Sequence, residues 1–379
     1  MVSIDAERLE AFMQAELSFL AQRPHEPLTL QRIVEASTPA KVAKLVHEEL
    51  PELFAARVKH IEAVPGWADQ PELVSIRDIF VQSFKDLRLS EPDLANAQSA
   101  ASLSDFTEVI YSIRRRHRPV TVLLGEAMRK MRRGDADAES TFQAWADVFL
   151  SSRISTEMLT SHYTKIIEAA GVNPTQVGVV DTKCNPGQIC QEAAEQVEKS
   201  FSEEAGAGDG IRITVQANNC INSQSEIEFS YIPRYLFYIV QELLRNSARA
   251  TLEAKQAAAA AGTPGPGPIA VTVCADQTQV VIRISDHANG LFGNDEKIWS
   301  YQFSTSAQPL KAYMDCASPL SGWGMGVPLG RLYAEYLGGS MELMNMPGTG
   351  VDAYLFLKRI ALDSGAGERA GQQAGQQAA

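Results

Sequence analysis

One predicted helix places a carboxylate, an amide and a guanidinium on the same face. Residues 233–252 carry apolar residues at helical spacing, and at 100° per residue Glu242, Asn246 and Arg249 fall within about 60° of one another. Such a face offers a base, a metal ligand and a contact for an anion. A solvated polar face would use the same residue types, so this helix alone leaves both interpretations open.

A second candidate follows the predicted strand 280–285. The strand ends in Asp286-His-Ala-Asn-Gly290, an acidic residue followed by a tight turn. A carboxylate at this position can accept a hydrogen bond from an adenine amino group. A simple hairpin turn is the alternative interpretation.

Glycines mark two further segments. The stretch Gly322-Trp-Gly-Met-Gly-Val-Pro328 precedes a predicted helix at 329–337, and Gly348-Thr-Gly350 precedes the last predicted strand. Alternating glycines let the backbone approach a phosphate, and the free N–H groups of a helix N-terminus attract an anion. No strand precedes the first segment, which disfavours a dinucleotide-binding motif. The second segment by itself predicts only a turn.

The elements that position these residues change character along the chain. Residues 1–170 have apolar residues at helical spacing and few helix breakers, which predicts long helices packed as a bundle. From about residue 175 the pattern predicts an α/β layer structure with helices at about 187–202 and 233–256. The predicted strands are 211–215, 227–231, 269–274, 280–285, 340–344 and 353–357.

Composition excludes several classes of protein. The net charge is −12, which argues against nucleic-acid binding because phosphate contact needs a basic face. The five cysteines include no CxxC pair, so neither a disulfide framework nor a zinc knuckle is indicated, and a reducing compartment fits best. No apolar run approaches the ~20 residues of a transmembrane helix. The N-terminus contains acidic residues and lacks the appearance of a transit peptide.

The order of the four motifs resembles the N, G1, G2 and G3 boxes of the superfamily that includes histidine kinases and the gyrase and MutL ATPases. Within this superfamily the chain resembles the mitochondrial pyruvate and branched-chain ketoacid dehydrogenase kinases. Residues 231–251 and 322–333 are similar to the N-box and G2 regions of that family. The helical half is similar at 28–30, 48–51, 116–117 and 151–155.

The resemblance implies an N-terminal four-helix bundle followed by a GHKL (Bergerat) α/β sandwich that binds ATP. The implied domains are an extension at 1–27, a helical regulatory and substrate-docking domain at 28–172, and a kinase domain at 173–361. A tail at 362–379, rich in Gly, Gln and Ala, is predicted to be disordered.

The resemblance also implies roles for individual residues. Glu242 is expected to be the general base that takes the proton from a substrate serine, and Asn246 to bind Mg²⁺ on the ATP phosphates. Asp286 is expected to accept from adenine. The other residues expected to contact ATP are Arg249, Gly290, Ser304, Thr305, Gly322, Trp323, Gly324, Met325, Gly326 and Val327.

Several positions depart from the family pattern around the proposed nucleotide pocket. Arg245 stands where the family has lysine, and Tyr238 stands where the family has a histidine that can touch the catalytic glutamate. Ala288 and Asn289 replace glycines, and Val351 replaces a threonine that bonds adenine through water. These changes leave the base and the metal ligand in place, which favours an active enzyme.

Four residues of the helical half resemble positions that line the family's regulatory pocket for a small 2-oxo acid. They are Arg114, His117, Ser152 and Arg153. A basic pocket suits a carboxylate ligand. Ion pairs within the bundle and a core histidine are the alternative, and Glu157 stands where the family has an arginine.

The implied function is an ATP- and Mg²⁺-dependent serine kinase of the mitochondrial matrix that phosphorylates the E1 alpha subunit of a 2-oxo acid dehydrogenase complex, pyruvate or branched-chain, and inhibits it. A homodimer and docking to a lipoyl domain of E2 are implied too, although the family's Asp-Trp motif is missing from the tail. The alternatives are an ATP-binding scaffold without activity and a histidine kinase, to whose H-box residues 47–51 bear a superficial likeness.

Overall fold

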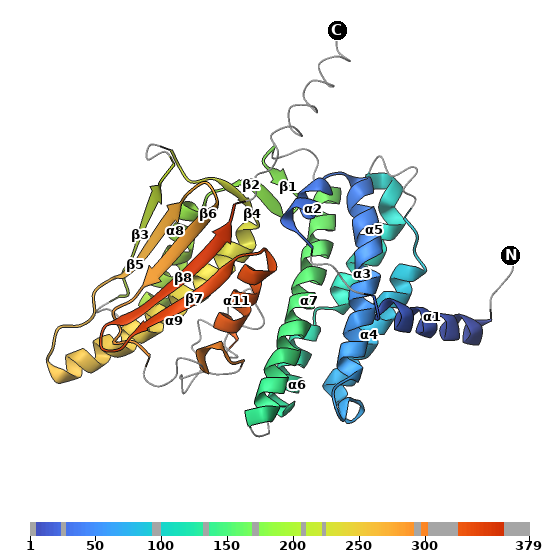
Figure 1. The fold of residues 1–379 in the computed structure, drawn as a ribbon, viewed down its shortest axis with the longest axis horizontal. Coiled ribbons are helices and arrows are strands. Elements are labelled where there is room, and N and C mark those ends of the chain that lie inside the picture. The colour runs from blue at the N-terminus through green and yellow to red at the C-terminus, as the bar shows by residue number, and fades with distance from the viewer. Residues whose placement is uncertain are drawn as a thin grey trace, which may run out of the picture.

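A computed structural model of the chain describes residues 5–23, 28–92, 100–131, 136–168, 174–205, 210–221, 225–291, 297–301 and 325–359. A helical region and a region of mixed helix and sheet lie side by side (Figure 1). This is the order of structure that the sequence predicts. No helix in the described ranges is long and apolar enough to cross a membrane.

The helical region consists of seven helices and two short 3-10 turns among the described residues. The helices are α1 Ala6–Leu20, α2 Leu30–Glu35, α3 Pro39–Glu62, α4 Pro71–Arg88, α5 Ser104–Arg116, α6 Val120–Met131 and α7 Ala136–Glu168. Helix α3 packs against α4 and α7, and its first turn is capped by the Thr38 hydroxyl, which accepts from the N–H of Lys41 at 3.4 Å. The buried apolar faces of these helices form the core of the region.

The second region contains a five-stranded sheet with the strand order β3-β5-β6-β8-β7. The strands are β3 Ile213–Asn219, β5 Ile269–Ala275, β6 Gln279–Ser285, β7 Ser340–Met346 and β8 Gly350–Lys358. Strands β3 and β5 are parallel, and the other neighbours are antiparallel. A separate three-stranded sheet holds β1 Gln176–Val177, β2 Val180–Cys184 and β4 Phe229–Tyr231.

Helices α8 (Pro186–Ala205), α9 (Pro233–Ala261) and α11 (Gly326–Tyr336) pack beside this sheet. Residues along β5 alternate between buried and partly exposed, as expected for a strand with one covered face. The apolar side of α9 predicted from the sequence is buried, and Leu236, Ile239 and Val240 are fully enclosed. The helix continues through the alanine run, because alanine favours helix strongly, and ends at Gly262 in a left-handed conformation.

Candidate nucleotide site and a second cavity

Glu242 is buried near the middle of helix α9. Glu242 is only 3% exposed, and its Oε1 accepts a hydrogen bond from Nη1 of Arg245 at 2.9 Å. Both members of this ion pair are almost completely buried. A buried carboxylate needs an opposite charge, so Arg245 has a clear reason to lie one turn away on the same helix.

Helix α11 begins directly against this carboxylate. A Cβ atom added to Gly326, the first residue of α11, would overlap Oε2 of Glu242 and lie 3.3 Å from its carboxyl carbon. A larger residue at position 326 would force the Glu242 carboxylate or helix α11 to shift. The free N–H groups and the positive end of the α11 dipole therefore lie beside the buried carboxylate of Glu242, and they form a place where a phosphate can bind.

Asn246 follows one turn after Glu242, and its side chain is exposed to solvent. The next residue, Ser247, makes a side-chain hydrogen bond to Asp286 at the end of β6. Asp286 is buried and also accepts from the N–H groups of Ala288 and Val351, each at 3.2 Å. Burial raises the pKa of Asp286 above its ordinary value, although these hydrogen bonds act in the opposite direction. Helix α9 and the Asp-turn thus meet through Ser247, which lies on the other side of the helix from Glu242 and Asn246.

The turn after Asp286 is held by the hairpin between β7 and β8. Asn289 and Gly290 both have positive φ, at 69° and 80°. The side-chain oxygen of Asn345 accepts from the N–H of Leu291 at 2.7 Å, and a Cβ on Gly290 would lie 2.7 Å from the same oxygen. Asparagine adopts the left-handed conformation at position 289, in agreement with its known tolerance of that region.

Gly350 is required by a close approach. A Cβ on this residue would overlap the carbonyl oxygen of Asp286 and lie 3.0 Å from Cα of His287. The sequence suggested only a turn at Gly348-Thr-Gly350. In the structure the second glycine lets β8 pass against the Asp-turn.

The departures from the family pattern have distinct surroundings. Tyr238 packs edge-on against Tyr333 of α11, with ring centroids 5.2 Å apart. Arg245 donates the hydrogen bond to Glu242 described above. Arg249 is partly buried on the same helix, and Met325 and Val327 are buried beside the start of α11. The predicted residues Ser304, Thr305, Gly322, Trp323 and Gly324 lie outside the described residues, as do the predicted tail 362–379 and most of the predicted domain boundary near residue 171.

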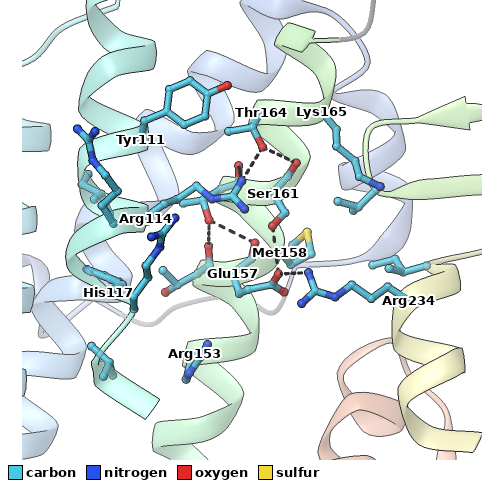
Figure 2. Close-up of a pocket in the computed structure, with 18 of the residues that line it drawn as sticks. Tyr111, Arg114, His117, Arg153, Glu157, Met158, Ser161, Thr164, Lys165 and Arg234 are labelled. Carbon is cyan, nitrogen blue, oxygen red and sulfur yellow. Dashed lines mark hydrogen bonds and ion pairs between the residues drawn. The ribbon is translucent and has the colours of Figure 1, made fainter. Parts of the chain in front are cut away.

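A second site lies between helices α5 and α7 and the first turn of α9, where a cavity of about 920 Å³ opens (Figure 2). Arg114, His117 and Arg153 line this cavity, so three of the four residues expected in a regulatory pocket come together. Ser152 does not line it; its carbonyl oxygen accepts from the hydroxyl of Thr156 at 3.0 Å.

His117 is one of the residues that line this cavity. Its Nε2 lies 3.0 Å from the hydroxyl of Ser83. Burial, together with the nearby positive charges of Arg153, Arg57 and Arg116, lowers the pKa of His117 to about 3. His117 is therefore a neutral hydrogen-bonding group at physiological pH. The positive charge around it comes from Arg153, Arg57 and Arg116.

Arg57 is a residue that the sequence analysis missed. It is 2% exposed, and its guanidinium lies over the rings of Phe149 and Phe80 at 4.2 and 5.1 Å. Neither Nη1 nor Nη2 has a hydrogen-bond partner among the described residues. Burial lowers its pKa to about 9, so it stays charged at neutral pH. The sequence signal for a buried arginine was its position in the apolar stretch Leu53-Phe-Ala-Ala-Arg57-Val58.

Glu157 joins the cavity wall to helix α9. Its Oε1 accepts from Nη1 of Arg234 at 3.0 Å and from the hydroxyl of Ser161 at 3.1 Å, and its Oε2 accepts from the hydroxyl of Tyr235 at 3.2 Å (Figure 2). Arg234 and Tyr235 belong to the first turn of α9, the helix that carries Glu242. One carboxylate therefore connects the cavity with the helix of the nucleotide site.

Known proteins resemble the chain over most of its length. The family model for mitochondrial branched-chain alpha-ketoacid dehydrogenase kinase matches residues 20–181. The mitochondrial pyruvate dehydrogenase (acetyl-transferring) kinase of Arabidopsis thaliana is 28% identical over 328 residues, which cover 84% of each chain. Isozyme 4 of the mouse kinase, Mus musculus, is 26% identical over 361 residues, covering 92% of this chain and 85% of the mouse protein. The chain is thus similar over most of its length to pyruvate dehydrogenase kinases and, in its helical region, to the branched-chain α-ketoacid dehydrogenase kinase family, and these similarities support a protein kinase.

Proposed function

We propose that this protein uses Mg-ATP to phosphorylate a serine of the E1 alpha subunit of a 2-oxo acid dehydrogenase complex, of the pyruvate or branched-chain type, and thereby inhibits the complex. One observation carries the proposal: the buried carboxylate of Glu242 lies against the glycine that starts helix α11, with the exposed amide of Asn246 one turn away. This arrangement supports a site in which Glu242 acts as the base, the start of α11 holds the phosphates and Asn246 binds the metal.

The proposed fold is a four-helix bundle at 28–172, after an extension at 1–27, followed by a GHKL sandwich at 173–361. Helix α9 supports this division, because its apolar side packs against the sheet and reaches the Asp-turn through Ser247, while its Glu242 lies against α11. Relatives with mitochondrial names support a location in the mitochondrial matrix.

The residues present fit Mg-ATP. The side-chain oxygen of Asn246 would hold Mg²⁺, and no group of three or more His, Cys, Asp or Glu among the described residues offers a site for a metal without phosphate. The metal, when bound, neutralises charge on the phosphates. Arg249 supports the same face of the helix.

Asp286 fits the adenine amino group. Its carboxylate accepts from Ala288, Val351 and Ser247, and a carboxylate has about four acceptor positions, so one position stays available for a ligand. Glu242 would then take the proton of the substrate serine while α11 holds the phosphates.

Two substitutions test this site. Glu242→Gln removes the base but keeps its shape, so we expect nucleotide binding to persist and phosphoryl transfer to fall by at least about 10²-fold. Asn246→Ala is expected to remove the Mg²⁺-dependent part of ATP affinity, measured by calorimetry. Gln241→Ala is a matched control, because Gln241 lies on the exposed side of α9 and bonds Gln196. Unchanged turnover in both site variants would refute the mechanism.

We also propose that the second cavity binds a small 2-oxo acid that regulates the kinase. Arg114, Arg153 and a neutral His117 line it. The buried guanidinium of Arg57 lies over the ring of the lining residue Phe80, and neither Nη1 nor Nη2 has a hydrogen-bond partner among the described residues. A carboxylate ligand would supply the missing negative charge. Millimolar pyruvate and 4-methyl-2-oxopentanoate are the probes. A melting temperature and a kinase rate that neither acid changes would refute the proposal.

Two partners are proposed on the family resemblance. A second copy of the chain would cover the face of the five-stranded sheet that the described helices leave open, where Tyr354 and Phe356 stack with ring centroids 6.2 Å apart. A lipoyl domain of E2 would tether the kinase to its complex. Sedimentation of the purified chain tests the first, and co-sedimentation with a lipoylated domain tests the second.

A further inference from the structure

One carboxylate of the helical region contacts two separate segments of the sheet region. Asp147 lies on α7, and its Oδ1 accepts a hydrogen bond from the hydroxyl of Tyr301 at 2.5 Å. Its Oδ2 lies 3.5 Å from Nη2 of Arg331 on α11. Helix α7 runs close to α11 in the fold (Figure 1), so this contact bridges the two regions.

Residues 297–301 contact both α7 and α11. Tyr301 is completely buried, and its backbone N–H donates to the side-chain oxygen of Gln143, also on α7, at 3.4 Å. The guanidinium of Arg331 lies over the ring of Trp299, and its Cζ is 5.4 Å from the ring centroid. Burial and the neighbouring carboxylate raise the pKa of Tyr301 well above its ordinary value, so its hydroxyl remains a donor.

Arg331 links this contact to the candidate nucleotide site through helix α11. It lies on the same helix as Gly326, five residues later, which corresponds to about 7.5 Å along the axis. Gly326 abuts the carboxylate of Glu242, where a shift of α11 would change the distance between its N-terminus and a bound phosphate. A helix moves as a rigid rod over this length, so a contact that fixes Arg331 also fixes Gly326.

We propose that Asp147 is a positioning residue for nucleotide binding, which holds the N-terminus of α11 at the phosphates through Arg331 and Tyr301. The helical region thereby becomes part of the ATP site without contacting the nucleotide. This inference rests on the proposed kinase function and adds to it a residue that lies outside the family's nucleotide-binding boxes.

Asp147→Asn is the test, because it keeps the side-chain shape and removes the charge. We expect the KM for ATP and the Kd of Mg-ATP to rise about tenfold while kcat stays within about twofold, because α9 and its base keep their places. Glu335→Gln is the matched control. Glu335 pairs with the same arginine at 3.8 Å and is half exposed, and we expect no change in either constant.

Tyr301→Phe provides a second route to the same answer, since it keeps the buried ring and removes only the hydroxyl. We expect it to weaken ATP binding in the same direction, and the double variant to be less than additive. If Asp147→Asn does not fold, as judged by circular dichroism, Tyr301→Phe carries the test. A wild-type protein that binds ATP together with folded variants of unchanged Kd and KM would overturn this inference. A wild type that binds no ATP would instead overturn the proposed function.

Discussion

The contact between Gly326 and Glu242 offers a direct way to displace the proposed base. In Gly326→Ala the new methyl group overlaps Oε2 of Glu242. The carboxylate is held on its other side by Arg245, so the two helices must separate or the carboxylate must turn. Ordinary contact requires a movement of roughly 1 Å, and a displacement of this size costs about 10²-fold in rate when it affects a reacting group. That corresponds to about 2.7 kcal/mol of activation free energy.

The assay is the initial rate of phosphate transfer from Mg-ATP, with ATP affinity measured separately. Gly330→Ala is a matched control on the same helix: its methyl group would lie 3.8 Å from the nearest atom, Cε of Met341, which is an ordinary contact. Alanine also favours helix over glycine by up to about 1 kcal/mol, so this control should be at least as stable as the wild type. A Gly326→Ala protein with the rate of the control would refute the placement of Glu242 as the base.

Three further predictions concern the helical region. Arg57→Met removes a buried charge, so the ligand-free protein should gain about 1–4 kcal/mol of stability in urea denaturation. Burial lowers the pKa of His162 to about 4, so this group binds a proton more readily when the chain is unfolded. The free energy of unfolding should therefore fall by about 1.4 kcal/mol per pH unit as the pH drops from about 6.5 towards 4, and His162→Gln should remove that part of the slope. Glu157→Gln removes a negative charge from the cavity wall, so pyruvate should bind several-fold more tightly, while stability changes by less than about 1 kcal/mol because Arg234 is 72% exposed.

Each of these has a clear contrary outcome. A less stable Arg57→Met protein would mean that the guanidinium is satisfied in the folded state. An identical pH dependence of stability in His162→Gln would mean that the histidine is not buried in its neutral form. Weaker binding of pyruvate to Glu157→Gln would show that the carboxylate holds the cavity open and does not repel the ligand.

The helix that carries the proposed site could be predicted from local spacing. The apolar positions of α9 repeat every three to four residues, and this pattern correctly identified which side packs into the core. Six of the eight strands among the described residues could be located from alternating apolar positions, although β3 begins two residues later than predicted, at Ile213. Strands β1 and β2 were not predicted. Their order in the sheet is not a local property and could not be obtained from spacing.

The contacts that give the site its chemistry join residues far apart in the chain. The burial of Glu242 depends on Gly326, and the need for glycine at position 350 comes from the pairing of β6 with β8, which brings Asp286 against it. Asp147 and Tyr301 are separated by 154 positions. No pattern within one segment predicts such pairs.

Arg57 shows a different limit. The sequence shows an arginine within an apolar stretch, and such a residue usually finds a carboxylate on a neighbouring helix. Only the packed structure shows that two aromatic rings occupy that place.

Glu242, as the base, and Asn246, as the Mg²⁺ ligand, are proposed to support phosphate transfer from Mg-ATP to a serine of a dehydrogenase E1 subunit. The most direct measurement is incubation of the chain with Mg-ATP and the E1 components of the pyruvate and branched-chain complexes, each in turn, followed by mapping of the phosphorylated residues. We predict phosphoserine on one E1 alpha subunit, dependent on Mg²⁺ and absent with Glu242→Gln. No phosphoserine on either subunit, or equal labelling by Glu242→Gln, would contradict the account.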